Sequence, residues 1–382
     1  MKDEEVSRLL HRKSDISSVD THRNTALHKA TIKGNREIAH ILLEKGANPR
    51  LRGNDGRTPL QIAVQDGNKP MVSLLLAGGA DTSTRSRDHD RLTVLHEAVL
   101  NGDEGMVALL LGAGADTLAR SKSGLTVLHL AVQRKNIAIL DLLLRTGVEV
   151  SARSNFGMTA LHFAVQHGIV EIVDLLLKAG ADTSGTCSNI TRAILDEAVT
   201  LRNIETVRLL LKSGAVPSEQ TLACFSKILS EVIRYGDLEI FDLLVKAGAD
   251  TSKMDSKTKG SLLKRAVALR NIELVRLLLK SGAVPSEQTL ACFSGVFTGE
   301  IRDGDLEIFN LLIKAGAEVS KMDSDTKSKL LDEAVGLGDI ELVGLLLKSG
   351  AVPSRRPLTC FSLRVKKRWR LGNIPFARQS RC

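Results

Sequence analysis

The chain has 382 residues, of which 43% are apolar, 25% are charged and 3% are aromatic. This composition excludes wholesale disorder, which requires low hydrophobicity and a high net charge. A core of Leu, Val, Ile and Ala with few aromatic residues favours packed helices over strands. The net charge of +9 is concentrated at the C-terminal end, because residues 355–382 hold nine Arg or Lys and no acidic residue. Residues 1–354 are therefore neutral, with 44 basic and 44 acidic residues.

The N-terminal sequence Met-Lys-Asp-Glu-Glu is not followed by an apolar run, so it does not resemble a secretory signal. No window of about 18 apolar residues is present, as a membrane span would require. The cysteine count of five is odd, which is typical of free thiols in a reducing compartment. The sequence therefore predicts a protein of the cytoplasm or the nucleus, with no classical signal peptide and no transmembrane helix.

A threonine-led tetrapeptide recurs through the first half of the chain, at 25–28, 58–61, 93–96, 126–129 and 159–162. Each copy is followed by an Ala-rich turn of helix and by a Leu-rich stretch that ends at a glycine. These repeat glycines continue through the second half, at steps of 34 residues after Gly180. They are Gly46, Gly79, Gly114, Gly147, Gly180, Gly214, Gly248, Gly282, Gly316 and Gly350.

Each repeated segment has the pattern of two short amphipathic helices. In the segment 159–180, Leu161, Ala164 and Val165 share one helical face, and the same spacing returns at residues 172, 175 and 176. Gly180 is predicted to end the second helix, since glycine adopts the left-handed conformation without steric cost. One such unit cannot bury its own apolar face, so neighbouring units must stack.

These motifs resemble the ankyrin repeat, whose period is about 33 residues and whose signature is Thr-Pro-Leu-His-x-Ala. The Thr-x-Leu-His openings and the Leu-Leu-Leu-x-x-Gly-Ala-Asp endings extend the resemblance over nearly the whole chain. The resemblance implies an all-α repeat solenoid of about ten stacked helix-turn-helix-hairpin repeats, with half-repeat caps at both ends. It also implies that hairpin tips and the first-helix surface bind other proteins.

Four segments differ in how regular the repeat is. Residues 1–19 are predicted to form an N-terminal capping half-repeat and 20–186 five regular repeats. Residues 187–356 form five degenerate repeats on a 68-residue double unit, and 357–382 a basic, truncated half-repeat. Within the double unit, 201–226 and 269–294 differ only at Thr206 and Leu274. The absence of a long linker predicts one continuous solenoid, which we expect to be a monomer.

Histidines and cysteines that recur with the repeat are interpreted as structural. The resemblance implies that the histidine at one repeat position ties the turn before the first helix: His28, His96, His129 and His162. Three cysteines lie two repeats apart, too far for one metal site, and are expected as small apolar core residues: Cys224, Cys292 and Cys360. No cluster of converging catalytic groups is recognisable, so we expect no enzyme activity, cofactor or metal.

The hairpin tips of the first five repeats hold the candidate partner-binding residues. Six residues after each repeat glycine comes an arginine, and hairpins in register would stack these into a row, here called the arginine ladder: Arg52, Arg85, Arg120 and Arg153. His89, Asn155 and Phe156 vary around the ladder, and exposed aromatic residues and Arg are typical of interface hot spots. A row of guanidinium groups favours an acidic segment on the partner.

The alternative interpretation is that these arginines only solvate the edge. The residues at the corresponding positions of later repeats are uncharged, so the ladder is predicted to end at the fifth repeat. Those residues, expected at later hairpin tips, are Gln220, Met254, Gln288 and Met322.

The C-terminal segment contains a short basic run: Arg364, Lys366, Lys367, Arg368, Trp369 and Arg370. It has three interpretations, namely a solvated capping helix, a nuclear import signal, and a contact for nucleic acid or an acidic lipid surface.

The sequence as a whole predicts a non-catalytic scaffold that binds one or more partner proteins on its concave hairpin and first-helix face. One alternative is an adaptor that recruits its bound target to a ubiquitin ligase or another complex through the C-terminal segment. Another is a binder of nucleic acid or a membrane surface through residues 355–382. The neutral body argues against a nucleic-acid groove, which needs a basic stripe.

Overall fold

The computed structural model describes residues 16, 18–21, 23–87, 90–183, 194–229, 235–296 and 303–352. They form helices joined by loops, with an isolated β-bridge between Val19 and Thr25. The chain divides into two compact units, Met1–Val216 (unit 1) and Pro217–Cys382 (unit 2). The fold class is the expected all-α repeat solenoid. Among the described residues no helix has the length and apolar character needed to cross a bilayer.

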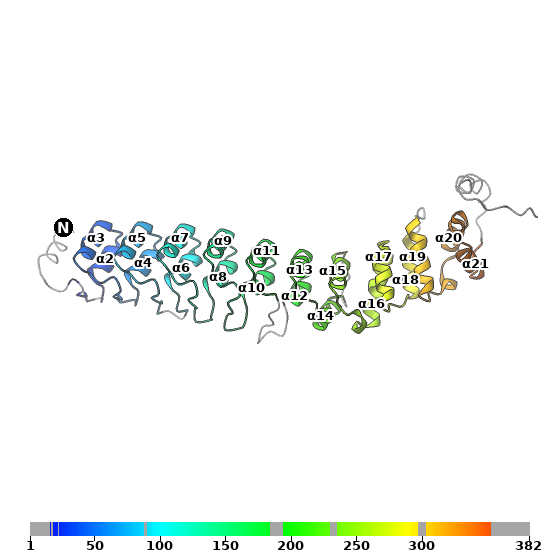
Figure 1. The fold of residues 1–382 in the computed structure, drawn as a ribbon, viewed down its shortest axis with the longest axis horizontal. Helices are drawn as coiled ribbons and strands as arrows, with labels where there is room; N and C mark the ends of the chain where they lie inside the picture. Colours follow the sequence, from blue (N-terminus) through cyan, green and yellow to red (C-terminus); the bar gives the residue numbers. More distant parts are fainter. Residues whose placement is uncertain are drawn as a thin grey trace, which may run out of the picture. The chain divides into compact units, whose positions relative to one another are not determined.

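In unit 1 the helices come in pairs, a first helix followed by a second (Figure 1). The first helices are α2 (Ala26–Ile32), α4 (Pro59–Gln65), α6 (Val94–Asn101), α8 (Val127–Gln133), α10 (Ala160–Gln166) and α12 (Ile194–Thr200). The second helices are α3 (Arg36–Glu44), α5 (Lys69–Ala77), α7 (Glu104–Gly112), α9 (Ile137–Arg145), α11 (Val170–Lys178) and α13 (Ile204–Lys212). Long loops project beside the first helices, on the side away from the second helices.

The threonine that opens a regular repeat is the N-cap of the first helix. The Thr58 side chain accepts from the backbone N–H of Gln61, and the Gln61 side chain accepts from the backbone N–H of Thr58. This reciprocal capping box satisfies two N–H groups that the helix itself leaves without a partner. At the other end of the repeat, Gly180 has φ 85°, the left-handed conformation predicted for it.

The first helices of unit 1 pack one on the next, from α2 through to α12. The leucine of the Thr-x-Leu-His motif fills the space between them and is at most 1% exposed in each regular repeat: Leu27, Leu60, Leu95, Leu128 and Leu161. Burying one leucine side chain contributes about 1.5–3 kcal/mol. This recurring leucine is therefore a main source of stability for the stack, and it sets the register of the loops.

Unit 2 is also built of helix pairs, but its first helices are longer. They are α14 (Glu219–Leu229), α16 (Ser256–Ala268), α18 (Glu287–Val296) and α20 (Ser324–Leu337). The second helices are α15 (Tyr235–Lys246), α17 (Ile272–Lys280), α19 (Asp303–Lys314) and α21 (Ile340–Lys348). Two short 3-10 helices, η1 (Thr251–Lys253) and η2 (Val319–Lys321), precede α16 and α20.

The expectation of hairpin tips in the second half is wrong for the residues named from the sequence. Gln220 and Gln288 lie in the first turns of α14 and α18. Met254 and Met322 follow the 3-10 helices and are each only 6% exposed. The physical reason is that the first helix begins within a few residues of the repeat glycine, so too little chain remains to form a hairpin.

The three recurring cysteines and the four predicted segments are described only in part by the structure. Cys224 is buried beside Phe225, as expected for an apolar core residue, whereas Cys292 is half-buried. Cys360 lies outside the described residues. So does most of the predicted cap 1–19, and so do the C-terminal half-repeat 357–382 and the proposed boundary at 186/187. The four predicted segments remain a prediction.

Candidate partner-binding surface

The loops that precede α4, α6, α8 and α10 are closed hairpins, and neighbouring hairpins contact one another. Across the hairpin bases, the backbone N–H of Ser121 donates to Leu125 (2.9 Å) and that of Ser154 to Met158 (2.8 Å). Between neighbouring hairpins, the N–H of Asn155 donates to the carbonyl of Ser123 (3.0 Å). We call the surface formed by residues 50–58, 84–92, 119–125 and 152–158 the hairpin edge; Asp88 and His89 within it lie outside the described residues.

Three of the four repeat histidines, His28, His96 and His129, hold these hairpins in place, as their structural interpretation predicts. Nδ1 of His129 lies 2.9 Å from the Thr126 hydroxyl, and its Nε2 lies 3.0 Å from the carbonyl of Met158 in the next hairpin. The carbonyl can only accept, so Nε2 carries the proton and Nδ1 accepts. His28 and His96 make the same two contacts. Nε2 of His28 contacts the carbonyl of Arg57, and Nε2 of His96 contacts the carbonyl of Leu125. Nδ1 of His162 lies 2.8 Å from the Thr159 hydroxyl, and residues 184–193, which follow its repeat, lie outside the described residues.

Burial decides the charge state of these histidines. Desolvation lowers the pKa of His28, His96 and His129 below the ordinary value, although a backbone carbonyl beside each ring acts in the opposite direction. A neutral ring also fits the geometry, because a protonated Nδ1 would no longer accept from the threonine backbone N–H. The imidazoles are therefore neutral caps between repeats and are unsuited to act as general acids.

The arginine ladder connects successive hairpins through its guanidinium groups. Nη2 of Arg52 donates to the carbonyl of Arg85 (2.8 Å). Nη1 of Arg85 donates in turn to the carbonyl of Arg120, and Nη1 of Arg120 to the carbonyl of Arg153. Nη1 of Arg153 donates to Gly157 in its own hairpin (3.1 Å). The four residues stand in the predicted row, and each of the first three reaches the backbone of the next.

The ladder remains accessible to solvent. Arg120 is exposed, and Arg52, Arg85 and Arg153 are partly exposed. Nη1 is the donor in the hydrogen bonds of Arg85 to Arg91 and Arg120 and in that of Arg120 to Arg153. These hydrogen bonds hold the guanidinium groups in position, which reduces the entropy lost when a partner binds.

The hairpin edge as a whole is strongly basic. It holds nine Arg or Lys against three Asp. Arg87 adds to the charge around Arg52, because both side chains lie against Gly56. Arg52 donates to the Gly56 carbonyl, and Cδ of Arg87 would lie 2.6 Å from a Cβ placed on Gly56. The basic residues are Arg50, Arg52, Arg57, Arg85, Arg87, Arg91, Arg120, Lys122 and Arg153.

Two of the three residues predicted beside the ladder, Asn155 and Phe156, are among the described residues, and they have different roles. Nδ2 of Asn155 donates to the carbonyl of Lys122 (2.8 Å), so its side chain joins two hairpins. Phe156 is 59% exposed at the tip of its hairpin, as an anchor residue would be. Sequence reasoning missed Leu118, which is 53% exposed just before the ladder residue Arg120. The sequence feature that could have indicated it is an apolar residue within an otherwise polar loop.

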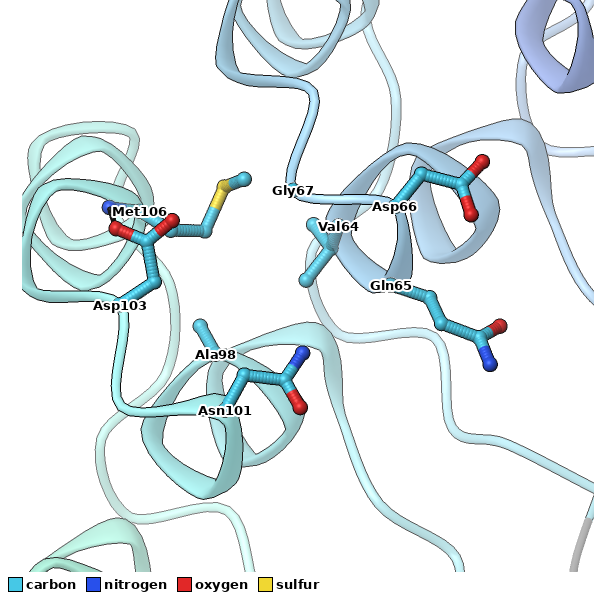
Figure 2. A pocket seen from close by; sticks show the side chains of 8 residues that line it. All are labelled: Val64, Gln65, Asp66, Gly67, Ala98, Asn101, Asp103 and Met106. Carbon is cyan, nitrogen blue, oxygen red and sulfur yellow. Dashed lines mark hydrogen bonds between the residues drawn. The ribbon is translucent and has the colours of Figure 1, made fainter.

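A recess of about 380 Å³ lies between the C-terminal turns of α4 and α6 (Figure 2). Its acidic residue Asp103 accepts from the backbone N–H of Met106 (3.0 Å) and pairs with Lys69 (2.7 Å), which holds the pKa of Asp103 below its usual value. Gln65 and Asp66 point away from Asp103. The recess is lined by Val64, Gln65, Asp66, Gly67, Ala98, Asn101, Asp103 and Met106, and its carboxyl groups do not converge.

The basic run of the tail lies outside the described residues, so its three interpretations remain predictions. It comprises Arg364, Lys366, Lys367, Arg368, Trp369 and Arg370.

Comparison with known proteins identifies relatives of the repeats. A family model described as ankyrin repeats (3 copies) matches residues 2–86, 95–187 and 128–221. Ankyrin repeat domain-containing protein 13C of Homo sapiens is 39% identical over 67 residues, which are 18% of this chain and 12% of that protein. Protein phosphatase 1 regulatory subunit 27 of Homo sapiens is 34% identical over 86 residues, 22% of this chain and 56% of that protein.

Among solved structures, the ankyrin repeat domain of Bcl-3, described as a member of the IkappaB protein family, matches with a TM-score of 0.47 and 27% identity. The match covers 53% of this chain and 97% of that domain. The segments shared with the two human relatives amount to 12% and 56% of their lengths, less than two thirds in either case.

Proposed function

The chain belongs to the ankyrin repeat family, and from that premise we propose that it is a non-catalytic scaffold whose principal protein-binding site is the hairpin edge of unit 1. Ankyrin repeats generally mediate protein–protein interaction. The partner itself, the acidic character of its contacting segment and the monomeric state of this chain are parts of the proposal.

One observation supports this choice of surface above the others, namely the arginine ladder. Three guanidinium groups are fixed to the backbone of the next hairpin, and Arg120 is exposed while Arg85 is partly exposed. Guanidinium pairs with carboxylate through two parallel hydrogen bonds. A surface with nine basic and three acidic residues therefore favours an acidic segment of a partner protein, and the exposed Phe156 adds an apolar contact.

The proposal of no catalysis has its own support. The side chains that most resemble catalytic groups are already engaged. The repeat histidines cap helices and join hairpins, and Asp103 caps α7 and pairs with Lys69. A catalytic site needs distinct groups that converge on a substrate, whereas these histidines lie in separate layers of the helix stack.

Charge reversal tests the proposed surface. Partners are captured from cell lysate with the full chain, and one is purified for calorimetry against the unmodified chain and a variant with Arg85→Glu and Arg120→Glu. The variant adds repulsion as well as removing attraction, so we expect a loss of affinity of about tenfold or more. Circular dichroism checks that the variant is folded, and sedimentation of the free chain tests the monomer.

The matched control reverses two exposed charges on the opposite side of unit 1, Arg36→Glu at the start of α3 and Lys45→Glu at its end. We expect this control to bind as the unmodified chain does. A folded ladder variant with unchanged affinity would show that the partner binds elsewhere, such as the first-helix surface or unit 2.

A further inference from the structure

The spacing of the arginine ladder carries more information than its charge. Each of Arg52, Arg85 and Arg120 touches the carbonyl of the next ladder residue. One step of the ladder is therefore one layer of the helix stack, although the sequence separation varies from 33 to 35 residues. Helices pack at about 8–10 Å between axes, so the guanidinium groups recur at about that distance along the edge.

Few peptide conformations present a carboxylate at this interval on one side. A β-strand advances about 3.3 Å per residue, but its side chains alternate, so residues i and i+3 face opposite ways. An α-helix advances about 1.5 Å per residue, so six or seven residues are needed for each step. A polyproline II helix has about 3 residues per turn and a rise of about 3.1 Å, which places every third side chain on one side at intervals of about 9 Å.

We propose that the hairpin edge binds an acidic peptide segment in the polyproline II conformation, with Asp or Glu at every third residue over four positions. This inference rests on the proposed function, because it specifies the partner segment at the same site. Each carboxylate of the segment pairs with one guanidinium of the ladder. The polyproline II backbone is preformed and has no internal hydrogen bonds, so it loses little conformational entropy when it binds.

The acidic residues of the edge favour a peptide over a nucleic-acid strand. Asp55 and Asp90 lie among the arginines of the edge. A nucleic-acid strand carries a negative charge on every unit, about 3.4 Å apart along the axis of a duplex strand, so some phosphates would face these carboxylates. A peptide with one acidic residue in three places neutral residues there instead. The exposed side chains of Leu118 and Phe156 also suit apolar residues between the acidic ones.

The test uses synthetic peptides of equal charge and the full chain. One peptide repeats Glu-Pro-Gln four times, so that Glu recurs every third residue. A second places four Glu at every second residue, and a third places four Glu at every seventh residue of an Ala-rich helix. A single-stranded oligonucleotide with four phosphates is the fourth probe. Fluorescence anisotropy with labelled probes, at about 0.05 M and 0.15 M salt, gives the four affinities.

We expect the Glu-Pro-Gln peptide to bind about tenfold or more tightly than each other probe. In the other probes the spacing of the negative charges differs from that of the arginines, so successive charges cannot each pair with a guanidinium group through two hydrogen bonds. The affinity of the Glu-Pro-Gln peptide should fall by about the same factor with Arg85→Glu and Arg120→Glu, and stay unchanged with Arg36→Glu and Lys45→Glu. Equal affinity for all three peptides would overturn the inference. So would a failure of all three peptides to bind, or tighter binding of the oligonucleotide than of the Glu-Pro-Gln peptide. The spacing comparison needs only the unmodified chain, so it does not depend on how the variants fold.

The result also separates this inference from the proposed function. If the spacing preference is absent while the purified protein partner still loses affinity upon charge reversal, the inference is wrong and the proposed surface stands. If the partner is also insensitive to the charge reversal, both are wrong.

Discussion

Units 1 and 2 bury the same leucine but use different polar groups beside it. Leu27 and Leu161 in regular repeats are each 1% exposed, and Leu263 and Leu331 at the same repeat position in unit 2 are 0% and 1% exposed. The next residue is a buried histidine in four of the five regular repeats and the buried Gln61 in the second, but it is Lys264 or Asp332 in unit 2, both half-buried. The apolar pattern thus preserves the helix stack while its polar connections change.

The difference follows from the presence or absence of hairpins. In unit 1 the imidazole and guanidinium groups reach carbonyls of the next hairpin. In unit 2 the ammonium of Lys327, a residue that is only 6% exposed, reaches the carbonyls of Ser320 (2.9 Å) and Ser349 (3.3 Å). Lys259 is bound to Ser252 in the same way (3.2 Å). A long loop needs a side chain that reaches across repeats, and the hairpin edge formed by these loops is the surface that we propose for binding.

Removal of one repeat histidine is the largest effect we expect. His129→Ala deletes the contacts to Thr126 and Met158 and leaves a cavity beside Phe163, whose ring lies 5.7 Å from the imidazole. The cost is about 3 kcal/mol. The control is Lys264→Ala, at the same repeat position of unit 2, where about 0–0.5 kcal/mol is expected. Urea unfolding followed by circular dichroism measures both, and equal losses would show that the histidine is not a specific connection.

Acidification tests three of these histidines together. The folded chain keeps His28, His96 and His129 neutral because burial lowers each pKa, whereas the unfolded chain takes up protons near pH 6.5, about the ordinary value. The unfolded state then binds more protons, so the stability of unit 1 is complete above that pH and falls as the pH drops below it. Residues 217–382 contain no histidine.

Hydrogen exchange, corrected for intrinsic rates, measures that contrast at pH 7.5 and pH 5.5. We expect protection to fall in α2, α6 and α8 and to hold in α16 and α18. A parallel loss in both units would rule out the histidines as its cause.

Loss of the buried lysine should weaken the last described repeat of unit 2. Lys327→Met keeps the aliphatic side chain but leaves the carbonyls of Ser320 and Ser349 without their donor, at a cost of about 1–3 kcal/mol. Lys329→Met, which removes the surface pair with Asp325, is the control, and about 0–1 kcal/mol is expected for it. Thermal unfolding compares the two, and a smaller effect at Lys327 than at Lys329 would contradict the assigned role.

The near-identical helices α13 and α17 allow a smaller test of burial. Thr206 is 0% exposed, and its Oγ1 has no hydrogen-bond partner among the described residues, whereas Leu274 holds the equivalent position in α17. Thr206→Val removes the buried hydroxyl at nearly constant volume, so we expect a gain of about 1 kcal/mol. Leu274→Val is the control and should lose stability instead. A loss of stability for Thr206→Val, seen by urea unfolding, would indicate a partner for the hydroxyl.

Single ladder substitutions should have the smallest effect. Arg120→Ala removes one solvent-exposed hydrogen bond to Arg153 and one contact to a partner. Exposed ionic contacts contribute about 0–1 kcal/mol each, so affinity and stability should both change little. A tenfold loss of partner affinity by calorimetry would show that the ladder acts through one dominant residue.

The sequence predicted the local structure of unit 1 well because the responsible interactions are short-range. The left-handed Gly180 and the structural histidines depend on contacts within one or two repeats. In unit 2 the position of a residue within the repeat did not predict its local structure. There the early start of α14 and α18 places Gln220 and Gln288 on helices, which the spacing of the repeat glycines did not indicate.

The candidate site was predictable in composition but not in its contacts. The repeat period alone placed Arg52, Arg85 and Arg120 in one row. The direction of each side chain toward the next carbonyl depends on the distance between hairpins, a three-dimensional quantity. The exposure of Leu118 was likewise hidden, because an apolar residue in a loop is buried or exposed according to the packing of its neighbours.

Hydrogen exchange of the full chain with and without its purified partner tests the central claim most directly. Our account predicts increased protection in residues 50–58, 84–87, 119–125 and 152–158, and unchanged protection in α16, α18 and α20. Protection confined to unit 2, or to second helices such as α5 and α7, would contradict the assignment of the hairpin edge as the principal binding surface.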